Sequence, residues 1–138
     1  MTEKDRVELN WAVEAGDYAK VDDLVTVVDI QAVKDRIGWN TLLHLAACNS
    51  DLDMVKKLLQ LGAVTGIKTV DTGGTALHLA IINLHEENLD LVKELVLAGE
   101  DVNEPDNDGY TPLYLAQAHE RKNIETYLKT KSAAELPA

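Results

Sequence analysis

Thr41-Leu42-Leu43-His44-Leu45-Ala46 is one of four similar six-residue phrases in this chain. The others read VELNWA at 7–12, TALHLA at 75–80 and TPLYLA at 111–116, so successive copies begin 34, 34 and 36 positions apart. A repeat of this length is one supersecondary unit, which cannot bury its apolar face alone and therefore stacks on its neighbours. The sequence predicts a stack of four such units.

The second unit indicates that each repeat is a pair of helices. Thr41 begins the first helix, because its hydroxyl can accept a hydrogen bond from a free backbone amide at a helix start. Gly62 follows the second helix, where a residue with positive φ is expected. The second helix has apolar residues three and four positions apart, as an amphipathic helix does; they are Leu52, Met54, Val55, Leu58 and Leu59.

The third unit carries an insertion. Its second helix, with apolar positions from Leu89 to Val96, begins three residues late, so His85-Glu86-Glu87 falls in the turn between the two helices. The segments 99–103 (GEDVN) and 106–109 (DNDG) contain the Asn, Asp and Gly residues that suit tight turns. We expect these segments to project between the units.

The Thr-x-Leu-His-Leu-Ala phrase and its period resemble those of the ankyrin repeat. The resemblance implies an all-α solenoid of four helix-turn-helix units with projecting β-turns. The units expected are 5–34, 35–68, 69–104 and 105–131, within a single domain at 1–131 that is followed by a loose tail at 132–138. Lys20, Lys122 and Glu125 occupy apolar slots of the repeat, which is typical of terminal capping units. The overall plan is similar to that of small myotrophin-like ankyrin proteins, and we expect either a complete small protein or a complete domain.

The chain is acidic, with a formal net charge of −11. Nine of its acids lie between Glu86 and Asp108 against Lys93 alone, which disfavours nucleic acid and favours a basic partner. The charged start is not a secretory signal, and no uncharged run reaches the ~18 residues of a membrane helix. Cys48 is the single cysteine, which suits a reducing compartment. We expect a monomer in the cytoplasm, with the nucleus as the alternative compartment, and with no membrane and no nucleic acid partner.

No catalytic, metal or cofactor motif stands out, so we expect no enzyme and no cofactor. His44 and His78 share one position in adjacent repeats, where the resemblance implies hydrogen bonds to backbone rather than a metal. Glu104, Asp106 and Asp108 resemble the front of a calcium loop, but Leu115 stands where the bidentate Glu is needed. A solvated acidic turn is therefore the better interpretation. Cys48 lacks the basic neighbourhood of a reactive thiol.

The leading functional hypothesis is a non-enzymatic protein-interaction module that binds a basic segment through its turn tips and concave groove. The alternative is an architectural or regulatory subunit that docks into a larger assembly by its ends. In ankyrin repeats the partner-reading positions lie just before the Thr and just after the apolar phrase. On this chain they fall on Ile37, Gly38, Trp39, Asn40, Cys48, Asn49, Asp71, Thr72, Gly74, Ile82, Asn83, Asn107, Asp108, Tyr110, Ala118 and His119.

Three further residues prompt separate hypotheses. Trp39, at a position that is Gly in the third and fourth units, is either a binding anchor or a lid on the next turn. Trp11 stands where other copies have a Leu, so we expect it in the core. Asn103 lies in a context that resembles an asparaginyl-hydroxylase substrate and is a candidate for β-hydroxylation. The alternative is that its side chain only closes the turn by hydrogen bonding.

Overall fold

The protein folds as a series of antiparallel helix pairs. A computed structural model describes residues 3–27 and 41–131. The helices in these ranges are α1 (Glu3–Ala15), α2 (Tyr18–Val27), α4 (Leu42–Cys48), α5 (Leu52–Gln60), α6 (Ala76–Ile82), α7 (Leu89–Leu97), α8 (Pro112–Ala118) and α9 (Lys122–Thr130). The expected all-α solenoid of helix pairs is confirmed. The expected unit boundaries stay a prediction, and the tail at 132–138 lies outside the described residues.

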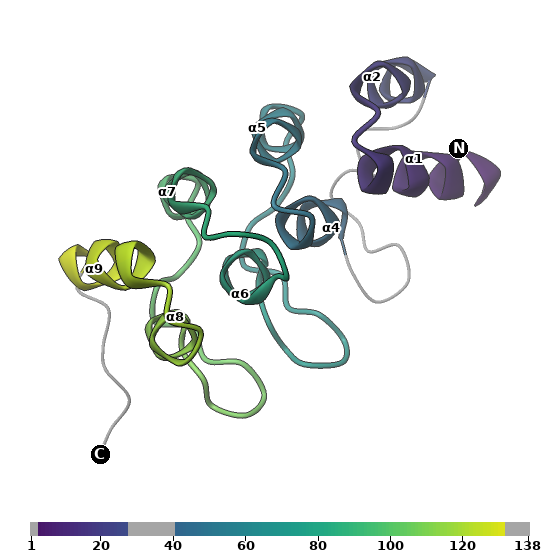
Figure 1. The fold of residues 1–138 in the computed structure, drawn as a ribbon. Coiled ribbons are helices and arrows are strands. Elements are labelled where there is room, and N and C mark those ends of the chain that lie inside the picture. The colour runs from purple at the N-terminus through teal and green to yellow at the C-terminus, as the bar shows by residue number, and fades with distance from the viewer. Residues whose placement is uncertain (1–2, 28–40, 132–138) are drawn as a thin grey trace.

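The helices form two rows (Figure 1). The inner row contains α1, α4, α6 and α8, and the outer row contains α2, α5, α7 and α9. Each inner helix contacts the outer helix that follows it in the chain, and α4 and α8 both pack against α6. Long loops leave the inner row on the side away from the outer helices. This arrangement gives the solenoid a face made by the inner helices and their projecting loops.

Capping residues determine where the helices begin. The backbone N–H of Thr41 donates to Nδ1 of His44 (3.0 Å), while the backbone N–H of His44 donates to the Thr41 hydroxyl (3.3 Å). The two bonds form a capping box, which satisfies amides that the helix leaves free. The outer helices α5 and α7 begin with a single side-chain cap: Asp51 accepts from the backbone of Met54, and Asn88 accepts from that of Leu91, each at 3.1 Å. Arg121 before α9 makes no such bond.

The core between the two rows is aliphatic. Small alanines such as Ala46 and Ala80 on the inner helices are buried together with leucines such as Leu58 and Leu95 on the outer ones. Alanine permits close approach of neighbouring helices, and leucine fills the space between the rows. The phrase that repeats in the sequence is therefore the part of each unit that packs against its neighbours.

The expectation that Trp11 is a core residue was wrong. Its side chain is 64% exposed on α1, next to the buried Ala12 and Val13. Its counterparts Leu45 and Leu79 are themselves only partly buried, and only Leu115 of the last unit is buried among the counterparts, so in the first three units this position lies at the edge of the inner row. A residue larger than leucine at that position extends outward instead of into the core.

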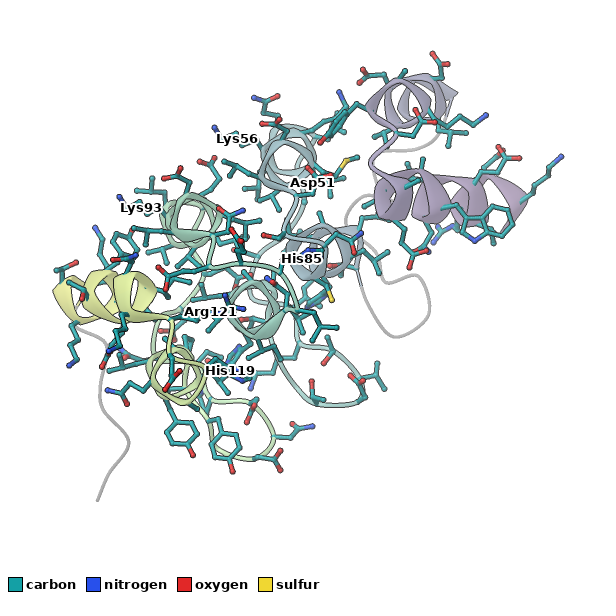
Figure 2. All side chains as sticks on the ribbon, in the orientation of Figure 1. Asp51, Lys56, His85, Lys93, His119 and Arg121 are labelled. Atoms are coloured by element: carbon teal, nitrogen blue, oxygen red, sulfur yellow. The ribbon has the colours of Figure 1, made fainter. Side chains whose placement is uncertain are left out.

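The helix pairs at the two ends carry polar outer surfaces. Lys20 on α2 and Lys122 on α9 are exposed, and Glu125 is half-buried beside Lys129 (3.5 Å) and Gln117 (3.1 Å). Two lysines of the outer row, Lys56 on α5 and Lys93 on α7, point away from the inner row (Figure 2). Exposed charge at the ends limits end-to-end stacking of one copy on another.

Candidate interaction surface

The projecting loops are held in place by the histidines of the inner helices. Nε2 of His44 lies 2.8 Å from the carbonyl oxygen of Ile67, and Nε2 of His78 lies 3.2 Å from that of Tyr110. Each of these carbonyls lies in the loop that leads to the next inner helix, α6 for Ile67 and α8 for Tyr110. Burial lowers the pKa of His78, which keeps its ring neutral near pH 7. The structural role expected for His44 and His78 is confirmed.

The loop tips of the third and fourth units are joined to one another. The backbone N–H of Asn107 donates to the carbonyl of Thr72 (2.9 Å), and its side chain donates to the carbonyl of Asp71 (3.3 Å). Gly73, with φ +71°, approaches Asn107 so closely that a Cβ would collide with it. Asp71 is exposed, and an N–H bond from the Thr72 backbone lowers the pKa of its carboxyl. The two tips therefore present a single acidic surface.

An apolar groove runs between α4 and α6. Cys48, Leu79 and Ile82 line its whole length. One part, of about 320 Å³, continues to Asn49, Asn83, Leu84 and His85, and the other, of about 170 Å³, continues to His44, Leu45, Thr69, Asp71 and Thr72. The groove thus connects the inner helices to the acidic loop tip of the third unit.

The inserted loop forms one wall of this groove. Residues 83–88 join α6 to α7, whereas only 49–51 join α4 to α5, so the expected insertion is confirmed. Nη2 of Arg121, which Figure 2 shows beside α6, donates to the carbonyls of Asn83 (3.0 Å) and His85 (2.8 Å). Arg121 thereby holds the loop, and Leu84 within it is fully exposed.

The structure brings several predicted contact residues together. Cys48, Asp71, Thr72 and Ile82 line the groove at the loop side, and Cys48, Asn49, Ile82 and Asn83 line it at the inserted loop. Asn107, Asp108 and Tyr110 are exposed at the loop of the fourth unit, and Ala118 and His119 are exposed at the end of α8. Ile37, Gly38, Trp39 and Asn40 lie outside the described residues.

Two predicted contact residues are buried. Asn83 is 7% exposed; its side chain donates to the carbonyl of Ala80 (2.8 Å) and accepts from the backbone of His85 (2.9 Å). Gly74 is buried against the His78 side chain. Both residues therefore shape the surface instead of presenting a side chain to a partner. For Asn83 the reason is the insertion, which folds back at the end of α6.

Leu84, His85 and Tyr114 were not among the predicted contact residues. Tyr114 replaces the histidine of the earlier phrases and is half-buried. Its ring stacks on that of Tyr110, with centroids 4.6 Å apart and planes inclined by 17°. Two features of the sequence could have pointed to these residues. The three-residue insertion marks the loop with Leu84 and His85, and the change from His to Tyr in the last phrase marks Tyr114.

One acid of the negative segment is inside the protein. Glu100 is 4% exposed, at the place where the second unit has Ala63. Burial raises its pKa to about 7, while N–H groups of Gly66 (3.1 Å) and Ala76 that donate to the carboxylate oppose the shift. The loop of the preceding unit closes over this side chain, so Glu100 is not part of the exposed acidic surface.

Within residues 3–27 and 41–131 no group of three or more His, Cys, Asp or Glu could hold a metal ion. Asp106 uses Oδ1 to accept from the backbones of Asp108 and Tyr110, each at 2.9 Å, which orders the acidic loop. In the same ranges no helix has both the length and the apolar character needed to span a bilayer.

A family model of ankyrin repeats (three copies) matches residues 9–103, which is more than half of the chain. The chain belongs to the ankyrin repeat family. Ankyrin repeats are generally protein–protein interaction modules, and the family is typically non-enzymatic. The histidine bonds and the linked loop tips described above are therefore contacts within and between ankyrin repeats.

Several relatives share this ankyrin sequence over part of their length. The nuclear factor NF-kappa-B p105 subunit of Gallus gallus is 32% identical over 87% of this chain and 13% of its own. Protein PhlB of Serratia liquefaciens is 34% identical over 83% of this chain and 48% of its own. Protein phosphatase 1 regulatory subunit 12A of Mus musculus is 46% identical over 44% of this chain and 6% of its own. The chain spans less than half the length of each of these relatives.

Proposed function

We propose that this ankyrin chain is a non-enzymatic module that binds a basic segment of a partner protein through its loop tips and the groove between α4 and α6. The observation that carries the proposal is the continuity of that groove with the acidic tip. Leu79 and Ile82 offer apolar surface, and Asp71 stands at the end of the same groove. An apolar side chain of the partner would enter the groove, and a cation would meet Asp71.

Charge on the loop tips supports this choice of partner. Asp71, Asp106 and Asp108 lie on two loops that Asn107 joins. Carboxylates gathered on one surface raise the rate at which a basic segment associates, and they repel nucleic acid. The proposal includes a monomeric protein, without cofactor, that acts in the cytoplasm or the nucleus.

The test uses a partner captured with the full chain and then purified. Ile82→Ser and Tyr110→Ala should each weaken its affinity by more than about 1 kcal/mol, because both remove buried apolar contact. Trp39→Ala should do the same if this residue is an anchor instead of a lid. Asp71→Asn should slow association, and added salt should reduce that effect.

The matched control is Asp90→Asn, which removes one exposed carboxylate from α7 in the outer row. The two substitutions change the net charge equally, so only the position differs. If Asp90→Asn slows association as much as Asp71→Asn, and if Ile82→Ser and Tyr110→Ala bind normally, the interface lies elsewhere.

A second candidate is docking by the first helix pair, and the exposure of Trp11 favours it. The ring borders a hollow lined by Glu8, Ala15 and Lys20. A large exposed aromatic side chain often marks an interface. Loss of partner binding in Trp11→Ser, with Ile82→Ser unaffected, would support docking by this end instead of by the groove.

A further inference from the structure

The stacked rings of Tyr110 and Tyr114 form an aromatic surface next to the acidic loop of the fourth unit. Tyr110 is 37% exposed, and Tyr114 is half-buried beneath it on α8. The backbone N–H of Tyr110 donates to Oδ1 of Asp106, and its carbonyl accepts from the backbone N–H of Asp106, each at 2.9 Å. These two bonds fix the backbone that carries the ring to the acidic turn. The aromatic faces and the carboxylates are therefore held in one place.

The carboxylates of this turn remain available to a ligand. Lys68 contacts the start of this loop: it pairs with Glu104 (2.6 Å) and donates to the carbonyl of Pro105 (3.2 Å). The salt bridges found in the described residues include neither Asp106 nor Asp108. Asp108 is exposed at the tip of the turn. A cation beside Tyr110 would thus meet uncompensated negative charge.

Another tyrosine of the same protein already binds cations through its ring. Nζ of Lys93 and Nζ of Lys131 each lie 5.6 Å from the ring centroid of Tyr127. In the part of the chain that the structure describes, both cation–ring contacts are on Tyr127 and none is on the Tyr110–Tyr114 pair. The ring of Tyr127 is therefore already in contact with two lysines of the protein, and it serves as a control for the Tyr110–Tyr114 pair.

We propose that the ring of Tyr110, supported by Tyr114, binds an arginine side chain of the partner together with the exposed carboxylate of Asp108 two residues earlier, an inference that rests on the proposed function. A planar guanidinium stacks on an aromatic face and at the same time directs paired N–H donors to a carboxylate. The ammonium of lysine is a compact, strongly hydrated charge that cannot do both in one plane. The surface therefore discriminates arginine from lysine, whereas the acidic tips at Asp71 respond to charge alone.

The test compares hexa-arginine and hexa-lysine peptides, titrated separately into the isotopically labelled full chain at one ionic strength and followed by amide chemical shifts. Hexa-arginine should bind about two- to fivefold more tightly, with shifts centred on 106–114. Tyr114→Leu and Tyr110→Leu should each abolish that preference while hexa-lysine affinity stays the same. Tyr114→Phe, which keeps the ring, should retain it. The control Tyr127→Leu removes a ring elsewhere and should also retain it.

The outcomes separate this inference from the proposed function. Equal affinities for the two peptides, or a preference that survives both leucine substitutions, would overturn the arginine site while binding at the loop tips still supports the proposed function. If neither peptide shifts any amide of 69–74 or 106–114, both proposals fail. The spectra of the Tyr110→Leu variant, which changes an exposed ring, show whether the fold is intact.

Discussion

Replacing Glu100 by glutamine should change how the stability of this protein depends on pH. Burial raises the pKa of Glu100 from 4.5 to about 7. A group whose pKa is higher in the folded chain stabilises the fold fully below its unfolded pKa, and this contribution is lost as the pH rises through the folded pKa. For Glu100 the loss falls between pH 4.5 and about 7. Acidification through this window should therefore stabilise the fold.

The size of the effect follows from the two pKa values. Complete protonation of Glu100 is worth about 3 kcal/mol of unfolding free energy, since one pKa unit corresponds to about 1.4 kcal/mol. When the pH falls from 8 to 5.5, protonation of Glu100 raises the free energy of unfolding by about 2 kcal/mol. His78 acts in the opposite sense, because its pKa is lowered by burial and stability is lost below its ordinary value of 6.5. Both chains contain His78, so its effect cancels in their difference.

Urea unfolding of the wild-type chain and Glu100→Gln, followed by circular dichroism at pH 8 and pH 5.5, measures this difference. Glutamine keeps an oxygen that can accept from Gly66, yet it carries no charge. The variant should be more stable than wild type at pH 8, and its advantage should shrink by about 2 kcal/mol at pH 5.5. Glu86→Gln, at an exposed residue, reports the loss of one surface charge. A stability difference for Glu100→Gln that is the same at both pH values would refute the reasoning.

Three further substitutions or treatments test other parts of the structure. Gly73→Ala should destabilise the fold by about 0.5–1 kcal/mol more than Gly109→Ala in urea, because both have positive φ but only the former displaces a hydrogen-bonded side chain; equal losses would contradict the close approach of the two loops. Arg121→Met should accelerate amide hydrogen exchange at 83–88, since the carbonyls of the inserted loop lose their donor, and unchanged exchange there would show that the loop needs no such support. Asn103, which is exposed, should gain one oxygen when the chain is incubated with an asparaginyl hydroxylase; peptide mass spectrometry that finds the residue unmodified would leave only its role in closing the turn.

The repeat pattern was sufficient to predict the helix pairs, because each phrase encodes its own cap and its own apolar stripe. Thr41 and His44 form their capping box within four residues, and Gly62 ends its unit with φ +97°. Such features depend on neighbours in the chain and are therefore visible in the sequence. The insertion at 85–87 could be located for the same reason, since it changes a local spacing.

The burial of individual side chains could not be predicted from the sequence. Asn83 and Glu100 look like surface residues in the chain, yet the inserted loop covers the first and the loop of the preceding unit covers the second. Trp11 looks like a core residue, yet its position lies at the edge of the inner row. Burial of a side chain depends on which segments lie over it: for Asn83 they are its own loop and the end of α6, whereas for Glu100 the covering loop is more than thirty residues away.

The sequence by itself determined the solenoid and the acidity of its loops, because period and charge are properties of residues in order. Stacking of the units was needed to bring Cys48 to Leu79 and Ile82 in one groove and to bond Asn107 to the loop tip at Asp71 and Thr72. The physical reason is that stacking sets neighbouring units about one helix diameter apart. Residues more than thirty positions apart become neighbours at that spacing, and side-chain size then decides which of them touch.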